Sequence, residues 1–355
     1  MTEASPTPTR LTIDLAALTA NWRAVAAKVA TETSAVVKAD AYGMGIEFAG
    51  AALAKAGCRT FFVATADEGR RLRKAAPAAT IYILAGLLPG EGAALVADNL
   101  RPVLGSMPEV AEWQAAGAPI GAALHVDTGM NRLGVTPGEA LAVDIARTKP
   151  SLLMSHLVIS EEPDHPLNRR QLDAFRAVRA AMPAVPASLA NSAGVYLGRD
   201  FHFDLVRPGI ALYGASPGPN VAAPMNVVAT AEARVLMVRE AAPGETVGYG
   251  ATRRLTRPTR IAVLGVGYAD GYHRVSAGDG AHVAIRGRPA PLLGRVSMDL
   301  MAVDATDIPG ATRGDWAELF GKQVPVDDVA ARAGTVGYEF LTGLGKRYER
   351  RYLGG

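Results

Sequence analysis

The chain of 355 residues has a single cysteine, no long hydrophobic run and no strong excess of one charge. The lone Cys58 excludes an intrachain disulfide framework and a cysteine-cluster metal site, which is typical of a reducing compartment. No window reaches the roughly eighteen consecutive apolar residues that a membrane span requires. The first ten residues show no basic region leading into an apolar run, so we expect no secretory signal. These absences predict a cytoplasmic protein with no membrane partner.

Charge and histidine content exclude two further classes of function. The net charge is only +3, and Lys and Arg alternate with Asp and Glu along most of the chain, so no nucleic-acid partner is expected. The one dense basic run, Lys346–Arg351, is typical of a solvated tail. The six histidines and the acidic residues lack ligand spacing, so we expect no metal and no metal-dependent enzyme.

Short apolar runs alternate with segments of helical spacing over the first 220 residues. Parallel strands that are buried on both faces read as such runs, because crossover helices cover the sheet. We predict an α/β fold in which residues 11–220 form a (β/α)8 barrel, with a doubly wound open sheet as the alternative. The eight predicted strands are Ala35–Val37, Thr60–Ala64, Thr80–Ala85, Arg101–Gly105, Ile120–Asp127, Ser151–Leu157, Pro186–Ala190 and Asp204–Gly214.

The pattern changes after residue 220. Apolar and polar residues now alternate at period two, and no long helical pattern interrupts them before Val326–Gly334. Residues 221–355 are therefore predicted to form a C-terminal, mostly antiparallel β domain. The stretch Leu11–Leu15 alternates like a strand ahead of the first helix, and it is a candidate strand of that second domain.

In a barrel of this kind, the chemistry lies at the carboxyl ends of the strands. The first predicted strand ends in Lys38, within the stretch AVVKADAYGMG. A poorly hydrated lysine has a lowered pKa, and its neutral amine can form a Schiff base with a carbonyl. The alternative is a solvated lysine at a strand end. Other polar residues at predicted strand ends are Asp127, Arg132, His156, Asn191, Ser192 and Arg207.

A phosphate site is expected after the last two strands. Ser192 follows the seventh strand, and Gly209 and Ile210 follow the start of the eighth. Hydroxyl and backbone N–H groups of these loops commonly bind phosphate in barrels, although Ser192 could equally cap a helix. A phosphate site beside a reactive lysine predicts pyridoxal 5'-phosphate as the cofactor.

Several longer motifs narrow this interpretation. The segments AVVKADAYGMG, HVDTGMNRLG, NSAG, RPGIALYG, VGYGA and GRVSMD occur in this order. With them the sequence resembles the bacterial alanine racemases from Leu11 to about Arg351. The lysine and RPGIALYG segments indicate the wider barrel-type pyridoxal-phosphate group, whereas VGYGA and GRVSMD narrow it to the racemases. The resemblance implies a homodimer with shared active sites that interconverts L- and D-alanine.

The resemblance also assigns roles to residues. Lys38 would carry the cofactor and act as one base, and Tyr249 of the partner subunit would act as the second base on the opposite face of Cα. Arg207 would face the pyridine nitrogen, and because a guanidinium only donates hydrogen bonds, that nitrogen should stay unprotonated. Further cofactor contacts would come from Tyr42, His156, Asn191, Ser192, Gly209 and Ile210, and substrate contacts from Arg132, Met298 and Tyr268.

The sequence departs from the family pattern at a few positions. His125 stands where some members carry a modified lysine that orients the arginine, and Ser297 replaces a frequent cysteine. Met44 stands where many members have histidine. The family's additional phosphate-binding tyrosine matches either Tyr348 or Tyr352.

Two other functions stay open beside alanine racemisation. The first is a racemase of the same fold with another or broader specificity, because packing in three dimensions sets the size of the pocket. The second is a non-catalytic pyridoxal-phosphate protein, although such proteins are single barrels. A biosynthetic and a catabolic role for D-alanine are equally compatible with the sequence.

Overall fold

The computed structural model describes residues 7–218, 220–221, 225–278 and 280–355, and it divides into two compact units. Ala17–Asn226 form one unit, and the described residues up to Ala16 join Val227–Gly355 in the other. Residues 1–6, part of the segment in which no secretory signal was expected, lie outside the described residues. In the ranges that are described, no helix is long and apolar enough to cross a membrane.

The first unit is a closed barrel of parallel strands. The first strand position is divided at Ser34 into β2 and β3, and the sheet continues from β3 through β4, β5, β6, β7 and β8 to β9. The last strand, β10, closes the ring because it pairs with β2 on one side. On its other side Asp204 N–H donates to the Ala187 carbonyl at 3.0 Å and Arg207 N–H to the Ala190 carbonyl at 2.9 Å. The predicted (β/α)8 barrel is confirmed, and the open sheet is excluded.

The observed strands are shorter than the predicted runs. The last run, Asp204–Gly214, is a strand only over Leu205–Val206, and a 3-10 helix follows at Ile210–Tyr213. Pro208 between them has no N–H to donate to a strand ladder, and Gly209 weakens a strand. The strands of the barrel are β2 (Glu32–Thr33), β3 (Ala35–Val36), β4 (Thr60–Val63), β5 (Thr80–Ile83), β6 (Arg101–Leu104), β7 (Ala122–His125), β8 (Pro150–Met154), β9 (Ala187–Ser188) and β10 (Leu205–Val206).

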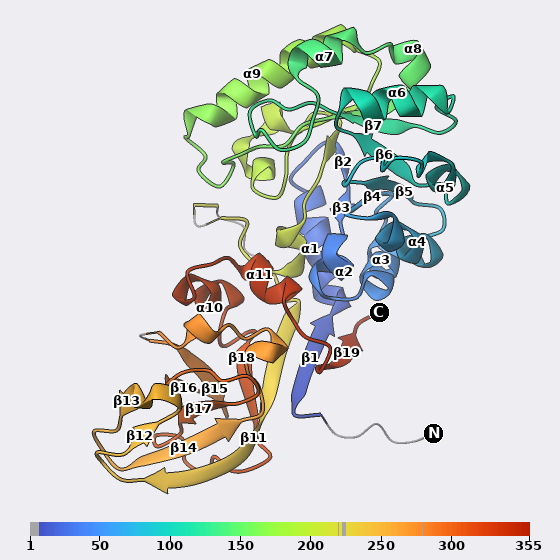
Figure 1. Ribbon diagram of the computed structural model, residues 1–355. Coiled ribbons are helices and arrows are strands. Elements are labelled where there is room, and N and C mark those ends of the chain that lie inside the picture. The colour runs from blue at the N-terminus through green and yellow to red at the C-terminus, as the bar shows by residue number, and fades with distance from the viewer. Residues whose placement is uncertain (1–6, 219, 222–224, 279) are drawn as a thin grey trace. The chain divides into compact units, whose positions relative to one another are not determined.

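Helices form an outer layer around these strands (Figure 1). All four residues of β4 are buried, as expected for a strand between a filled barrel interior and a helical layer. The helices are α1 (Leu15–Ala26), α2 (Lys38–Tyr42), α3 (Ile46–Lys55), α4 (Ala66–Ala75), α5 (Gly92–Ala97), α6 (Met107–Ala115), α7 (Pro137–Ala142), α8 (Ile145–Thr148) and α9 (Pro166–Ala181).

The second unit is built on an eight-stranded, mostly antiparallel sheet in the order β14-β17-β16-β15-β18-β11-β1-β19. The long strand β11 pairs with β1 and β18 through its first half and with β14 through its second half, after a register shift between Val235 and Met237. Its length is plain in Figure 1. The predicted antiparallel β domain is confirmed, with one parallel pairing, between β1 and β19.

The elements of this unit are β1 (Thr9–Asp14), β11 (Ala229–Ala241), β12 (Thr246–Val247), β13 (Arg253–Arg254), β14 (Thr259–Leu264), β15 (His282–Ile285), β16 (Arg288–Leu293), β17 (Met301–Asp304), β18 (Trp316–Phe320), α10 (Val326–Arg332), α11 (Gly337–Thr342) and β19 (Glu349–Leu353). The helical pattern at Val326–Gly334 thus predicts α10, whereas the period-two interpretation did not anticipate α11.

The buried side-chain amide of Asn21 joins α1 to the C-terminal segment of the barrel unit. Asn21 is fully buried, and its Nδ2 donates to the carbonyls of Leu212 at 3.1 Å and Asn226 at 2.9 Å. Its Oδ1 accepts the Asn226 backbone N–H at 2.8 Å. The Asn21 side chain therefore satisfies three backbone groups, two of them on the segment at which the barrel unit ends.

Replacing Asn21 by Ala should lower the free energy of unfolding by about 1–3 kcal/mol, because the buried Leu212 carbonyl and the two backbone groups of Asn226 lose their partner. Arg23→Ala, on the exposed side of the same helix, is the matched control and should change that free energy by less than about 0.5 kcal/mol. Chemical denaturation of both variants measures the difference. Equal effects would show that the Asn21 bonds do not stabilise the barrel.

Candidate active site

Lys38 is separated from the end of β3 by one residue, lies at the carboxyl end of the first strand position, and begins an unusual turn. The four residues that follow it, Ala39 to Tyr42, all have positive φ, between 52° and 55°, although none is glycine. Gly43 and Gly45 then continue with φ of 80° and 88°. The turn thus begins, ahead of these glycines, on residues for which a left-handed conformation costs about 1–2 kcal/mol each.

The amine of Lys38 is prepared for reaction by its surroundings. Its side chain reaches solvent at the mouth of the barrel, but the surrounding walls desolvate its ammonium group and thereby lower its pKa. The nearby Arg132 lowers the pKa of Lys38 further, and the carboxylate of Glu68 partly opposes both effects. The lowered pKa expected for a lysine at this place is thus present in the structure.

Hydroxyl and backbone N–H groups gather beside this turn. The Ser192 hydroxyl accepts the N–H of Gly209 at 2.8 Å and that of Ala211 at 3.4 Å. A Cβ on Gly209 would lie 2.4 Å from the Tyr42 hydroxyl, so only glycine allows this approach. The Tyr42 ring stacks on Tyr213, with ring centroids 4.5 Å apart. The arrangement is a cradle of hydroxyls and amides of the kind that binds phosphate.

The other residues expected at the cradle have different surroundings. Ile210 is buried at the start of its 3-10 helix, directly after Gly209. The Oδ1 of Asn191 accepts the Gly194 N–H at 2.8 Å and the Ser160 hydroxyl at 2.9 Å. Asn191 therefore orders the turn that follows β9.

Arg207 lies in the interior beside His156. Its guanidinium donates to the Ser188 hydroxyl and to the Ser155 carbonyl, both at 2.5 Å, and its Nη2 lies 3.4 Å from His156 Nδ1. Burial lowers the pKa of Arg207 to about 9, so the group keeps its charge at neutral pH. Among the described residues, no carboxylate forms an ion pair with Arg207. Burial and the charge of Arg207 hold the pKa of His156 well below its usual value, so His156 is neutral.

The carboxyl ends of β3, β7, β8, β9 and β10 thus bring a reactive amine, buried positive charge, neutral imidazole and a cradle of hydroxyls to one mouth. These groups suit a cofactor with a phosphate, a carbonyl and a ring nitrogen that accepts a hydrogen bond. Comparison with known proteins decides between the possible families.

The family model for the N-terminal domain of alanine racemase matches residues 13–217, and the model for its C-terminal domain matches residues 228–352. The biosynthetic alanine racemase of Agrobacterium fabrum is 50% identical over 98% of this chain and 94% of its own length. The catabolic alanine racemase of the same organism is 42% identical over 97% of this chain and 92% of its own. This chain belongs to the alanine racemase family.

A solved structure supports the same assignment. The alanine racemase of Bartonella henselae, whose structure contains covalently bound pyridoxal phosphate, aligns with a TM-score of 0.93 and 39% identity. The alignment covers 98% of this chain and all of that one. The family's two-domain fold therefore extends over the described chain.

Three residues expected at an alanine racemase site belong to the β domain. Tyr249, Tyr268 and Met298 are exposed there, with 71%, 42% and 54% of their surface accessible. Tyr249 is the first residue of a short 3-10 helix, Tyr249–Ala251. It lies between Gly248 and Gly250, which both have a φ of 74°. The structure thus divides the expected site residues between the two units and leaves the phenol of Tyr249 accessible.

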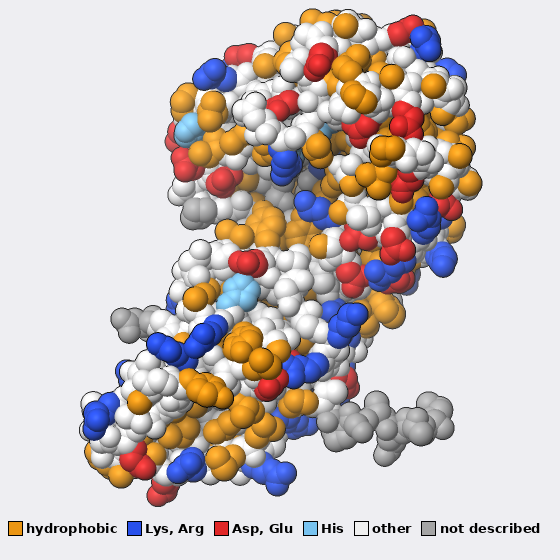
Figure 2. All heavy atoms as spheres, viewed as in Figure 1, with side chains coloured by type: hydrophobic (Ala, Val, Ile, Leu, Met, Phe, Trp, Pro, Cys, Tyr) orange, Lys and Arg blue, Asp and Glu red, His pale blue; other side chains and the backbone are white. Residues whose placement is uncertain are grey.

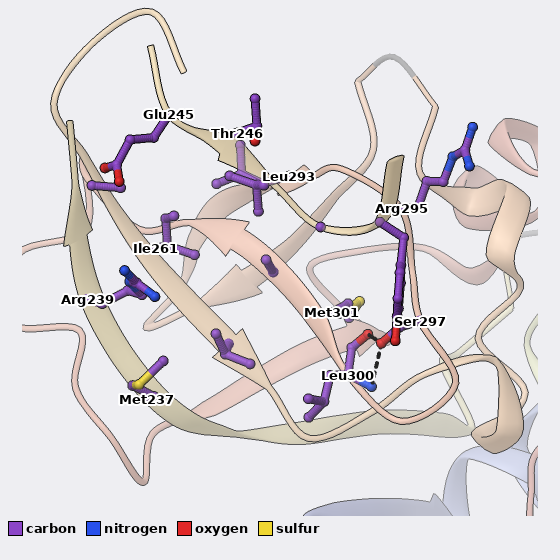
Figure 3. Close-up of a pocket in the computed structure, with 16 residues that line it drawn as sticks. Met237, Arg239, Glu245, Thr246, Ile261, Leu293, Arg295, Ser297, Leu300 and Met301 are labelled. Carbon is purple, nitrogen blue, oxygen red and sulfur yellow. Dashed lines mark hydrogen bonds between the residues drawn. The ribbon is translucent and has the colours of Figure 1, made fainter. Parts of the chain in front are cut away.

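The β domain also contains a hollow of about 540 Å³, which Figure 3 shows. Its lining is mainly apolar, including Met237, Leu293 and Leu300, and Tyr249 and Arg295 also line it. Figure 2 shows hydrophobic side chains gathered on the visible face of this domain. The hollow contains no lysine, so we place the chemistry at the barrel mouth and not here.

The departures from the family pattern have local explanations. His125, at the end of β7, is buried, and burial together with Arg207 and Arg132 lowers its pKa to about 4. The Ser297 hydroxyl donates to the Leu300 carbonyl at 2.6 Å and accepts the Leu300 N–H at 3.3 Å, bonds that a thiol makes only weakly. Met44 is fully buried in the core.

The two candidate tyrosines near the C-terminus differ in their surroundings. Tyr348 is buried, and this burial raises the pKa of its phenol, whereas Tyr352 is half-buried on β19.

Sequence reasoning missed Glu68 and Arg71, which contact the turn after Lys38. Arg71 lies 2.6 Å from Asp40 Oδ1, and Glu68 accepts the Asp40 N–H at 3.1 Å. The only signal was the spacing of Thr65 and Glu68, which is typical of a helix start. Thr65 does cap α4, but the Glu68 side chain accepts N–H groups of Asp40 and Ala64.

Stability should fall as the pH is lowered from about 6.5 to about 4, because an unfolded histidine binds its proton near pH 6.5 while His125 does so near 4. This group alone accounts for a loss of up to about 3 kcal/mol. His125→Gln should therefore flatten the decline in the free energy of unfolding over this range. His282→Gln in the β domain should leave the decline unchanged, and the same result in His125→Gln would contradict the account.

Proposed function

We propose that this protein is a pyridoxal-phosphate-dependent alanine racemase that interconverts L- and D-alanine. The observation that carries the proposal is the placement of Lys38, with its lowered pKa, beside a cradle of hydroxyls and amides in a chain of the alanine racemase family. Relatives named alanine racemase match it over nearly their full length.

The residues at the barrel mouth fit this cofactor. Lys38 would bind its aldehyde covalently, and Tyr42, Ser192, Gly209 and Ile210 would hold its phosphate. Arg207, which only donates and has no carboxylate partner among the described residues, would face the ring nitrogen. His156 lies beside Arg207 and would pack near the ring. When bound, pyridoxal phosphate withdraws electrons from the substrate and so acidifies the proton on Cα.

Racemisation requires a proton to leave one face of Cα and another to arrive on the opposite face. The Lys38 amine, neutral in part because its pKa is lowered, would hold or release the proton on one face. The Tyr249 hydroxyl would do so on the other face. Arg132, exposed on the loop after β7, would hold the substrate carboxylate or steer the phenol.

The second base would come from a partner subunit. Tyr249 lies on a different compact unit from Lys38 and is 71% exposed in the single chain, which leaves it available to another copy. In a homodimer, Tyr249, Tyr268 and Met298 of the partner subunit would close the site and limit the room for the substrate side chain. That limit favours alanine over larger amino acids. A wall that left more room for the substrate side chain would give a racemase of broader substrate specificity.

A non-catalytic pyridoxal-phosphate protein is the weaker candidate, because the β domain matches the racemase C-terminal model. Relatives named biosynthetic and catabolic are 50% and 42% identical, which favours the biosynthetic role. We also propose a cytoplasmic location, and cell fractionation would test it.

Purified protein with ample cofactor should absorb near the edge of the visible range, and borohydride reduction should fix the cofactor on Lys38. Peptide mapping by mass spectrometry measures the labelled position. Lys38→Ala should carry no label, while Lys55→Ala, on the outer helix α3, should be labelled as the unchanged protein is. A label on another lysine would exclude the assignment of Lys38.

Tyr249→Phe should lose racemisation in both directions, because each direction needs both groups. It should still exchange the Cα proton of one enantiomer, expected to be D-alanine, with deuterium through Lys38. A positioned acid or base contributes about a hundred- to ten-thousand-fold, so the difference between enantiomers is measurable by NMR. Equal residual exchange from both enantiomers would mean that one base serves both faces.

A further inference from the structure

The turn after Lys38 needs support from its neighbours. Four consecutive residues, Ala39 to Tyr42, adopt a left-handed conformation that none of them favours. Such strain persists only where surrounding contacts fix it. Since Lys38 begins this turn and Tyr42 ends it, whatever holds the turn also places the amine and the cradle hydroxyl.

Glu68 provides one of these contacts from α4, the helix that follows the neighbouring strand β4. It lies in the first turn of α4, which follows β4, the strand that pairs with β3. Its Oε1 accepts the Asp40 N–H at 3.1 Å, and its Oε2 accepts the Ala64 N–H at 2.8 Å. A single carboxylate therefore joins the end of β4 to the second residue after Lys38.

Glu68 also differs from the other acids near the turn in its charge balance. Asp40 and Glu47 both pair with Arg71, at 2.6 Å in each case, so these two carboxylates share the positive charge of one guanidinium. Within the described part of the chain, no Lys, Arg or His forms an ion pair with Glu68. Its carboxylate is satisfied by neutral backbone N–H groups, and its negative charge remains directed at nearby cations.

Lys38 is such a cation. The charged and titratable groups that act on it from the surrounding elements are Glu68 on α4, Arg132 on the loop after β7 and His156 after β8. Arg132 repels the ammonium form, His156 is neutral, and Glu68 attracts it. Among these groups Glu68 supplies the one stabilising charge.

We propose that Glu68 is the positioning residue of Lys38: its carboxylate fixes the left-handed turn that places the amine, and its negative charge attracts that amine. The inference rests on the proposed function in so far as Lys38 exchanges the proton of Cα. The placement of Lys38 by Glu68 can be measured without that activity.

Three variants separate the two parts of the proposal. Glu68→Gln removes the charge and one of the two acceptor oxygens. Glu68→Asp keeps the charge but shortens the side chain so that it no longer reaches Asp40. Glu47→Gln is the matched control, because Glu47 lies near the same turn and pairs with Arg71 but does not act on Lys38.

The first measurement is the pH dependence of Lys38 acetylation in the full-length protein without cofactor, followed by mass spectrometry. Glu68→Gln should lower the midpoint by about half a unit to one unit, because the amine loses its attracting charge. Glu68→Asp and Glu47→Gln should leave it unchanged. An unchanged midpoint in Glu68→Gln would overturn the electrostatic part of the proposal.

The second measurement is amide hydrogen exchange in the segment around Asp40. Exchange should quicken by at least about tenfold in Glu68→Asp, because the Asp40 N–H loses its acceptor, and by less in Glu68→Gln, which keeps one oxygen for the two N–H groups. It should not change in Glu47→Gln, and unchanged exchange in Glu68→Asp would overturn the positioning part. If Glu68→Gln does not fold, Glu68→Asp decides the positioning part by itself.

Racemase activity then tests whether the two effects matter for turnover. The pH profile of kcat in Glu68→Gln should shift in the same direction as the acetylation midpoint, while Glu68→Asp should lower kcat without that shift. If the unchanged protein racemises no amino acid, the proposed function fails. The acetylation and exchange results then still decide whether Glu68 positions Lys38.

Discussion

Closure of the parallel barrel is the constraint on which the site depends. The pairing of β10 with β2, together with the backbone bonds from Asp204 and Arg207 to the segment after β9, completes the ring. Because all strands are parallel, their carboxyl ends lie at one mouth. Residues separated by up to 169 positions, from Lys38 to Arg207, therefore share one environment. An open sheet would leave the first and last strands on opposite edges.

The electrostatics of that mouth follow from burial. Arg207 keeps its positive charge in the interior without a carboxylate partner among the described residues, and Arg132 adds a second charge. Desolvation and these two charges hold His125 and His156 neutral, and desolvation together with Arg132 lowers the pKa of Lys38. A site with fixed positive charge and an amine of lowered pKa suits an anionic ligand that also carries a carbonyl.

The sequence predicted the eight strand positions and the lysine at the first strand end, because buried parallel strands leave continuous apolar runs and a lysine interrupts them visibly. It did not predict the left-handed turn at Ala39–Tyr42, since these residues have no preference for it and contacts from α4 impose it. Glu68 stands three residues after Thr65, the spacing of an ordinary helix start, so nothing in the sequence indicated that its side chain contacts Asp40. Tyr249 was found through the family resemblance alone, because a tyrosine in a glycine-rich turn has no distinctive pattern.

A single chain leaves the exposed phenol of Tyr249 on a separate unit from Lys38, and we propose that two subunits build each site. Mixing inactive Lys38→Ala protein with inactive Tyr249→Phe protein tests it most directly. After subunit exchange, half of the dimers are hybrids with one intact site, so racemisation should recover to about a quarter of the unchanged protein's rate. No recovery after verified exchange would contradict a shared site.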